Sequence, residues 1–447
     1  MASAAEQLVT GLSWGVLARA SELKKRILFT LGALVVYRFG TYVPLPGIDP
    51  SSLADVFSRN QSGILGMFDM LAGGALGRMT LFALNIMPYI SASIILQLAT
   101  VMVPSLEALK KEGESGRKVI NQYVRYCTVL IAVFQAWAIA VGLESMASSR
   151  GSVVLDPGLF FRFTTVVTLV GGTLLLMWLG EQISSRGVGN GISLIIFAGI
   201  VANLPQALAS TLELGRTGAL HPLLIAVLFV MAVFVIAFIV FVERAQRRIL
   251  VQYPKRQVGH KVYGGDSSHL PIKINTAGVI PPIFASSILL LPITLVGFSP
   301  GQGSPWLSFL SEWLGHGQPA YVALYMAMIV FFSFFYTAVV FNPHDTAETL
   351  RKNGGFVPGV RPGKNTSEYF DYVLTRLTAV GSLYLVFISV LPELLVAKLA
   401  VPFYFGGTSL LIVVSVTMDT VSQVQSHLLA HQYEGLIRKS KLRGRVV

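Results

Sequence analysis

Charged residues and cysteines are scarce in this sequence of 447 residues. Only 13% of the residues are charged, where about a quarter is usual for soluble proteins. The one cysteine, Cys127, excludes a disulfide within the chain and a cysteine-ligated metal cluster. No GxxxxGK[ST] string occurs, so a P-loop nucleotide site is also excluded. With 53% hydrophobic residues, the composition points to lipid as the main solvent of the fold.

Long apolar runs fill the sequence instead. Each has roughly 20 mostly apolar residues, the length that a helix needs to cross a bilayer. Continuous rather than alternating apolar character favours helices over barrel strands. We therefore predict an all-α polytopic membrane protein with ten transmembrane helices, at Arg26–Val43, Met79–Val103, Gln122–Leu143, Phe160–Gly180, Gly191–Leu208, Pro222–Phe241, Thr276–Gly297, Ala320–Phe341, Tyr372–Leu391 and Phe405–Val421.

Lysine and arginine are distributed unevenly between the predicted loops. Of the 34 basic residues, 27 lie on the side that holds both termini, and the remaining seven lie on the other. The positive-inside rule therefore places both termini in the cytoplasm. The net charge of +12 is then mainly a topological signal, although an anionic ribosome could bind the same face.

The ten spans divide five and five around Ala209–His221, which gives an N-terminal half at 1–209 and a C-terminal half at 210–447. Halves with an odd number of spans insert in opposite senses, which permits an inverted repeat with a site between the halves. No repeat is visible residue by residue, so the inverted relation follows from the count alone.

Two loops on the cytoplasmic side are long, at 242–274 and 342–371, and a basic tail follows the last span. Both loops are rich in Lys and Arg, and glycines and prolines in Gly354–Gly363 predict tight turns. A shared docking platform is one interpretation, and loops that only set topology are the other. Their length favours docking, since topology needs only a few basic residues near span ends.

The segment Ser62–Gly77, SGILGMFDMLAGGALG, is apolar but too short to span a bilayer. Asp69 interrupts it, and three glycines lie at its end. A half-helix that re-enters the membrane needs a covering of protein or water. A helix on the periplasmic surface fits the same pattern.

Isoleucines recur at helical spacing in two spans. Ile86 and Ile90 are four residues apart, as are Ile196 and Ile200, so each pair shares a helical face. Branched aliphatic residues from several helices can close a pore by excluding water, whereas a single isoleucine in a span more often faces lipid or a packing neighbour. Polar residues within spans fit either ordinary helix packing or a seam between helices that part; they include Ser91, Gln135, Ser286 and Ser287.

Seven long strings resemble the SecY family of protein-conducting channels, from the region before the second span to the last span. They are ALGRMTLFALNIMPYISASIILQL (Ala75–Leu98), KKEGESGR (Lys110–Arg117), WLGEQISSRGVGNGISLIIFAGIVA (Trp178–Ala202), FVERAQRRILVQYPKRQ (Phe241–Gln257), NTAGVIPPIFASSI (Asn275–Ile288), FVPGVRPGKNT (Phe356–Thr366) and YFGGTSLLIVVSVTMD (Tyr404–Asp419).

The resemblance implies an hourglass pore between the two halves and assigns roles to matching residues. The pore ring is Ile86, Ile90, Ile196, Ile200, Ile283 and Ile412. The plug is 63–75, with Ile64, Leu65, Met67, Phe68, Met70 and Leu71. The lateral gate between spans two and three and spans seven and eight includes Ser91, Gln135, Ser286 and Ser287. Lys255, Arg256 and Arg361 dock a motor or ribosome.

The resemblance also implies partners and a place in the cell. SecE and SecG are the expected subunits, and the SecA motor or the ribosome, including its RNA, drives transport. Signal sequences of preproteins and membrane lipid contact the channel, and no cofactor, metal or small-molecule substrate is expected. The location implied is the bacterial inner membrane.

We therefore predict a passive conduit and not an enzyme. The alternative is an ion-coupled secondary transporter, which usually needs an ionisable group at mid-membrane. An intramembrane enzyme needs a catalytic pair within the spans. The span centres contain no Asp, Glu, Lys or Arg, and all seven histidines lie in loops, at span edges or in the tail.

Overall fold

The structure is a computed structural model, and it describes residues 21–59, 69, 73–145, 147–148, 151–218, 221–253, 256–258, 261–263, 267–297, 318–399 and 407–443. A helix overlaps each of the ten predicted spans. These helices are α3 (Ser21–Gly40), α6 (Met87–Met102), α8 (Glu114–Ser145), α9 (Leu159–Arg186), α10 (Gly191–Arg216), α11 (Pro222–Arg244), α12 (Ile280–Gly297), α14 (Pro319–Val340), α16 (Lys364–Leu399) and α17 (Gly407–Arg443).

By length and hydropathy, six described helices can each cross a bilayer, or seven if a bent pair counts as one span. That pair is α6 with α7 (Pro104–Lys111), which meet at a 98° bend. Val103 between them is extended, at φ −107° and ψ 112°, as expected for a residue before proline. The chain therefore turns sharply where the second predicted span ends.

The helix of the second span begins later than predicted, at Met87 rather than Met79. Residues 73–86 form a series of turns, in which Met79 and Asn85 have φ values of 41° and 50°. Such left-handed positions cannot continue a right-handed helix. Pro88 lies in the first turn of α6, where its missing N–H costs nothing.

The helices of each half pack mainly in chain order. In the N-terminal half α8 packs against α6 and α9, and α9 packs against α3 and α10. In the C-terminal half α14 packs against α12 and α16, and α17 packs against α11 and α16. The halves meet where α12 contacts α6 and α8, where α10 contacts α11 and α17, and where α3 contacts α17. The largest buried cluster draws side chains from both halves, so the core lies between them.

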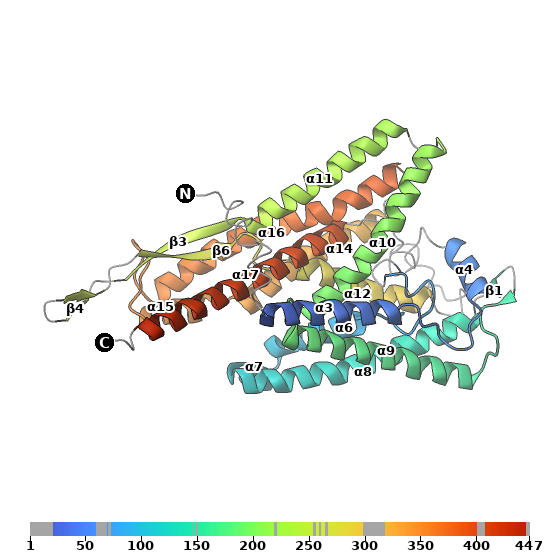
Figure 1. Cartoon of the computed structure of the whole chain (residues 1–447), viewed down its shortest axis with the longest axis horizontal. Coiled ribbons are helices and arrows are strands. Elements are labelled where there is room, and N and C mark those ends of the chain that lie inside the picture. Colours follow the sequence, from blue (N-terminus) through green and yellow to red (C-terminus); the bar gives the residue numbers. More distant parts are fainter. Residues whose placement is uncertain are drawn as a thin grey trace.

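The ends of the molecule carry the remaining elements (Figure 1). At one end lie the antiparallel strands β3 (Gln246–Gln252) and β6 (Ser267–Lys273), the helix α15 (Pro343–Lys352) and the short pair β4 (Arg256–Val258) and β5 (Lys261–Tyr263). At the other lie α4 (Pro50–Arg59) and the pair β1 (Ala147–Ser148) and β2 (Gly151–Ser152). We call the first the loop end, because both long loops lie there.

Candidate functional site

The two long loops fold together into one unit at the loop end. Strands β3 and β6 form a regular hairpin ribbon from Gln246–Lys273 to Gln252–Ser267. Beyond it, Gln252 and Phe356 of the second loop exchange backbone hydrogen bonds of 2.9 and 3.0 Å. The two loops therefore share a backbone bridge as well as side-chain contacts.

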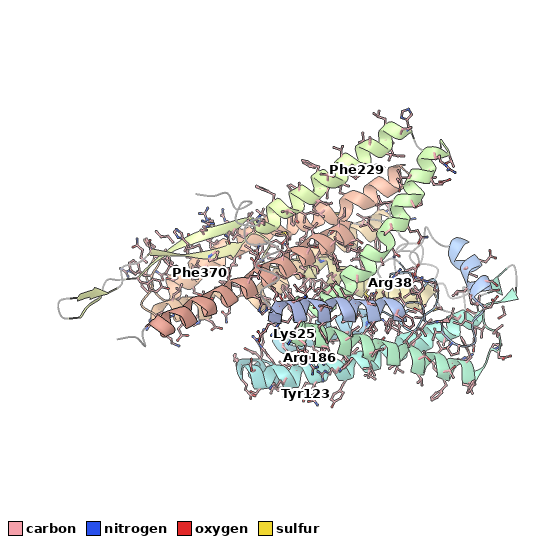
Figure 2. The ribbon with its side chains drawn as sticks, in the orientation of Figure 1. Lys25, Arg38, Tyr123, Arg186, Phe229 and Phe370 are labelled. Carbon is pink, nitrogen blue, oxygen red and sulfur yellow. The ribbon has the colours of Figure 1, made fainter. Side chains whose placement is uncertain are left out.

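A small hydrophobic cluster of its own holds this unit together. Its buried members come from the hairpin, α15, the following turn and α16; they are Ile249, Ile272, Ala347, Val357, Phe370 and Leu374. Phe370 is fully buried and lies at the loop end in Figure 2. We call the hairpin β3–β6, α15, the turns to Gly363 and the first three turns of α16 the loop platform.

The surface of the loop platform is basic. Its exposed cations include Arg247, Arg248, Lys273, Arg351, Lys352, Arg361 and Lys364. Two of them have acidic neighbours on the same helix: Lys352 lies 3.0 Å from Glu348, and Lys364 lies 3.9 Å from Glu368. An anionic partner surface is the natural complement of this arrangement.

Of the three predicted docking residues, only Arg361 has a described side chain. Arg361 is exposed, in a turn between Gly359 and Gly363, both with positive φ. Its carbonyl accepts a 2.9 Å hydrogen bond from the Thr366 hydroxyl, which fixes the turn to the start of α16. The backbone of Arg256 lies in β4, while its side chain, and all of Lys255, lie outside the described residues.

The six predicted ring isoleucines all belong to the large central cluster. Ile86 and Ile200 are almost fully buried, and Ile90, Ile196 and Ile412 are at most 7% exposed. Ile283 is half-buried at the edge of the same cluster. These residues come from α6, α10, α12 and α17 and from the residue just before α6, so both halves contribute. The structure thus places all six predicted residues in or against the large buried cluster that both halves share.

The predicted gate residues belong to α6, α8 and α12, and α12 contacts both of the other helices. Ser91, Ser286 and Ser287 are buried, and Gln135 of α8 is half-buried. The hydroxyls of Ser286 and Ser287 both donate to the Ile283 carbonyl, at 2.9 and 2.7 Å. Since their hydroxyls bond within their own helix, they do not tie α12 to its neighbours.

The predicted plug residues Ile64, Leu65, Met67, Phe68, Met70 and Leu71 lie outside the described residues. The chain after them is held by arginines. The guanidinium groups of Arg38 and Arg78 donate to the Gly73 carbonyl, at 2.9 and 3.2 Å, and both lie over the ring of Tyr42. The Asp69 carboxylate accepts a 2.5 Å hydrogen bond from the Gly77 amide. Residues 73–78 are therefore fixed against the end of α3.

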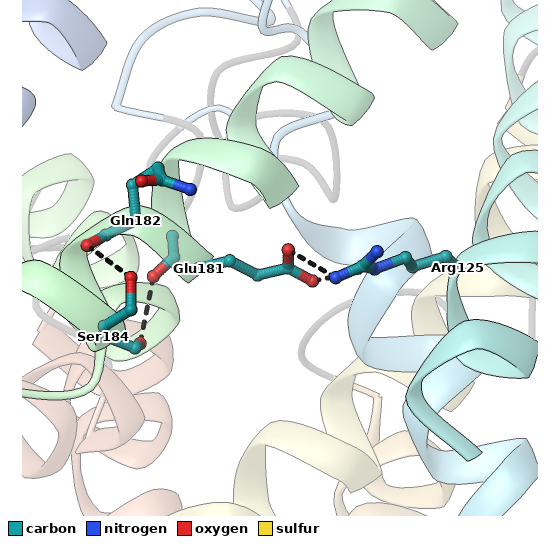
Figure 3. Close-up of polar contacts among 6 residues, drawn as sticks. Arg125, Glu181, Gln182 and Ser184 are labelled. Atoms are coloured by element: carbon teal, nitrogen blue, oxygen red, sulfur yellow. Dashed lines mark hydrogen bonds and ion pairs between the residues drawn. The ribbon is translucent and has the colours of Figure 1, made fainter. Parts of the chain in front are cut away.

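An ion pair that the sequence did not predict joins α8 to α9. Arg125 Nε and Nη2 donate to the two carboxylate oxygens of Glu181, at 3.0 and 2.7 Å (Figure 3). Arg125 shares a helical face with the buried residues Thr128 and Ala132, away from the exposed apolar side chains of α8, yet 48% of its side chain is exposed. A charge within a span requires water or a partner. Arg125 lies at the edge of the third predicted span and was counted with the basic residues of the loops, so its pairing with Glu181 was not predicted.

Comparisons with known proteins agree with one another. A family model described as SecY matches residues 80–421. The chain is 58% identical over 423 residues to "Protein translocase subunit SecY" of Rickettsia conorii (strain ATCC VR-613 / Malish 7), covering 95% of this chain and 98% of that protein. Among solved structures, "The structure of a protein conducting channel" is similar with a TM-score of 0.62 and 18% identity, covering 90% of this chain and 92% of that one. "Sec61 in the Canine ribosome-channel complex from the endoplasmic reticulum" has a TM-score of 0.60 at 18% identity and the same coverage.

Proposed function

The chain belongs to the SecY family, and from this premise we propose how its residues act in protein transport. As a member of that family it is the central pore subunit of the Sec translocon, a multi-pass membrane protein that conducts polypeptides and is not an enzyme. Our proposal is that it passes signal-bearing unfolded chains across the bacterial inner membrane, with both termini in the cytoplasm. Apolar segments leave sideways because lipid solvates them better, by about 0.8 kcal/mol per buried CH₂.

The observation that carries this proposal is the aliphatic cluster between the halves. Ile86, Ile90, Ile196, Ile200, Ile283 and Ile412 bring branched side chains from four spans to one buried region. In our proposal they form the ring that the translocating chain threads. Such a ring excludes water when closed, and it seals around a chain without reading its side chains.

The other sites act around this ring. Residues 63–75 are the plug, anchored at its end by Arg38 and Arg78. The seam of α12 with α6 and α8 is the lateral gate, opened by a signal sequence, and the serines there let the helices approach closely. Arg125 and Glu181 pair α8 with α9 on the cytoplasmic side, where both side chains are partly exposed.

The loop platform is the docking site for the source of energy. Arg361, Lys255 and Arg256 contact the SecA motor or the ribosome and its RNA, and SecE and SecG complete the channel. Support comes from the basic exposed surface and from the structural relative whose title places Sec61 in a ribosome-channel complex. An ion-coupled transporter is not favoured, because the related proteins are channels and translocase subunits.

Reconstitution tests both the conduit and its docking site. The purified chain with SecE, SecA and ATP should protect a signal-bearing preprotein from added protease. Arg361→Gln should reduce this protection about tenfold, because docking loses an exposed charge contact at a fixed turn. Lys352→Gln removes an equal charge from the same platform, at a residue already paired with Glu348, and should leave protection within about twofold.

The outcomes separate the two parts of the proposal. Equal protection by Arg361→Gln and the unchanged chain contradicts docking at Arg361. No protection by the unchanged chain, although it is inserted and the motor hydrolyses ATP, contradicts transport driven by this motor.

A further inference from the structure

One carboxylate is buried at the junction between the loop platform and the helices. Glu243 lies in the last turn of α11 and is 9% exposed. Among the residues that the structure describes, its side chain is the one charged group in the buried class. The Asn275 amide, only 3% exposed, donates to Glu243 Oε1 at 2.7 Å and to the Gly278 carbonyl at 3.1 Å. A buried carboxylate is retained at a cost, so its position calls for a function.

The backbone closes the same junction. Gln246 pairs with Lys273 at the base of the hairpin, and the Ile274 amide donates to the Ala245 carbonyl at 3.1 Å. The side-chain hydrogen bond between Asn275 and Glu243 follows directly after these backbone bonds. The end of α11 and the approach to α12 are therefore joined by backbone and side-chain bonds in succession.

A third helix touches this segment. Gly381 of α16 faces the backbone of Ile274, and a Cβ at position 381 would lie 3.0 Å from the Ile274 carbonyl oxygen. The first turns of α16 belong to the loop platform, and Phe370 and Leu374 of this helix are buried in the hydrophobic cluster of the platform. Two of the helices that flank the loops, α11 and α16, thus meet at Ile274–Asn275, just before a third, α12, begins.

The segment leads directly into the helix of the proposed gate. After the positive-φ turn at Gly278, α12 begins at Ile280 and carries Ile283, Ser286 and Ser287. The hydroxyls of both serines bond within α12, so the position of this helix depends on packing and on its anchored start.

We propose that Glu243 and Asn275 are positioning residues that couple the loop platform to α12. When a docked partner shifts the platform, their bond moves the start of α12 with it and displaces Ile283 and the gate serines. This inference rests on the proposed docking function. If the Glu243–Asn275 bond only stabilised the base of the β3–β6 hairpin, its loss would not change the opening of the lateral gate.

An isosteric exchange tests the coupling. Asn275→Asp leaves shape unchanged but places two carboxylates together. In reconstituted channels with SecE, the maximal rate of preprotein translocation should fall about tenfold, whereas the SecA concentration for half-maximal rate should stay within about twofold. The double variant Glu243→Gln/Asn275→Asp restores one donor and one acceptor between the two side chains and removes the repulsion, while the bond from position 275 to the Gly278 carbonyl stays lost. Its maximal rate should therefore rise at least about threefold above that of Asn275→Asp, without reaching that of the unchanged chain.

Asn121→Asp is the matched control, because it adds the same charge to an exposed position of α8, outside the loop platform and outside the proposed ring and gate. Its maximal rate should match the unchanged chain. Rates are compared per folded channel, measured by resistance of the hairpin to trypsin. A normal maximal rate in Asn275→Asp, or no recovery in the double variant, overturns the coupling while docking stands. If the unchanged chain shows no saturable dependence on SecA, the docking proposal fails, and the coupling fails with it.

Discussion

At the scale of single residues, the spacing of four and the resemblance to the family selected the six ring isoleucines, and the structure adds that five of them are buried. Their role as a ring stays a prediction, and the sequence did not predict how polar groups are paired. Arg125 and Glu181 were missed because each lies at the edge of a predicted span. Glu243 was missed for the same reason, and only the fold shows that Asn275 covers it.

Ile412 offers a direct test of the ring. Replacing this 3% exposed residue with Asn should hydrate the constriction. Export of preproteins with defective signal sequences should then rise about tenfold above that of the unchanged chain. Ile239→Asn is the control, since this fully buried isoleucine of α11 lies in the same cluster outside the proposed ring. Both variants carry a buried amide, at about 1–3 kcal/mol if it is unpaired. Export that rises equally in both variants would remove the special role of Ile412.

Asp49 predicts a pH dependence at the other end of the molecule. Its carboxylate accepts hydrogen bonds from the Ser52 side chain, the Ser51 hydroxyl and the Ser51 and Ser52 amides, which together lower its pKa to about 2. The folded pKa lies below the ordinary value of 3.8, so the charged carboxylate stabilises the start of α4. The protection of the first amides of α4 from hydrogen exchange should therefore be complete above about pH 4 and be lost as the pH falls toward 2.

Hydrogen exchange of the first amides of α4, corrected for intrinsic rates, measures this loss. Asp49→Asn keeps a good capping residue but cannot titrate, so its protection should not change between pH 4 and 2. A decline of equal size in Asp49→Asn would assign the pH dependence to another group.

At the scale of elements, hydropathy located helices well and strands poorly. Each of the ten predicted runs overlaps a helix, because apolar runs of span length have few alternatives in lipid. The bounds were less accurate, since α16 begins at Lys364 rather than Tyr372 and α17 continues to Arg443 rather than ending at Val421. The hairpin β3–β6 was read as loop, although Ile249 and Val251 alternate with exposed residues as a strand requires. Its Lys and Arg content concealed that alternation. The late start of α6 depends on the left-handed Met79 and Asn85, which no local sequence rule predicts.

Phe370 tests whether the two loops form one stable element. Phe370→Ala should remove about 3–5 kcal/mol from the packing of the loop platform. Trypsin should then cleave faster after Arg247 and Arg248 in β3, by about tenfold or more at low protease concentration, where cleavage follows local opening. Phe229→Ala is the matched control, because Phe229 of α11 is 67% exposed. Unchanged cleavage in Phe370→Ala would mean that the hairpin is stable without the second loop.

At the scale of the whole molecule, the division into halves and the inverted relation between them remain predictions from span count. The structure adds that the halves meet through α12, through α10 and through α3. The central cluster contains buried side chains from both halves. A pore at this place can widen by parting the halves, without breaking the helices of either one.

Orientation in the membrane is the prediction that belongs to the whole chain. The loop end and the α4 end lie at opposite ends of the long axis (Figure 1), and the basic residues are concentrated on the side of the two long loops. The positive-inside rule therefore places the loop end in the cytoplasm. In a Cys127→Ser background, single cysteines replace Ser51 of α4 and Ser267 of β6, both exposed. A membrane-impermeant maleimide added to intact spheroplasts should label Ser51→Cys and should label Ser267→Cys only after lysis. The reverse pattern would invert the topology and move the docking platform to the wrong side for any cytosolic motor, while labelling of both before lysis would show that no bilayer separates the two ends.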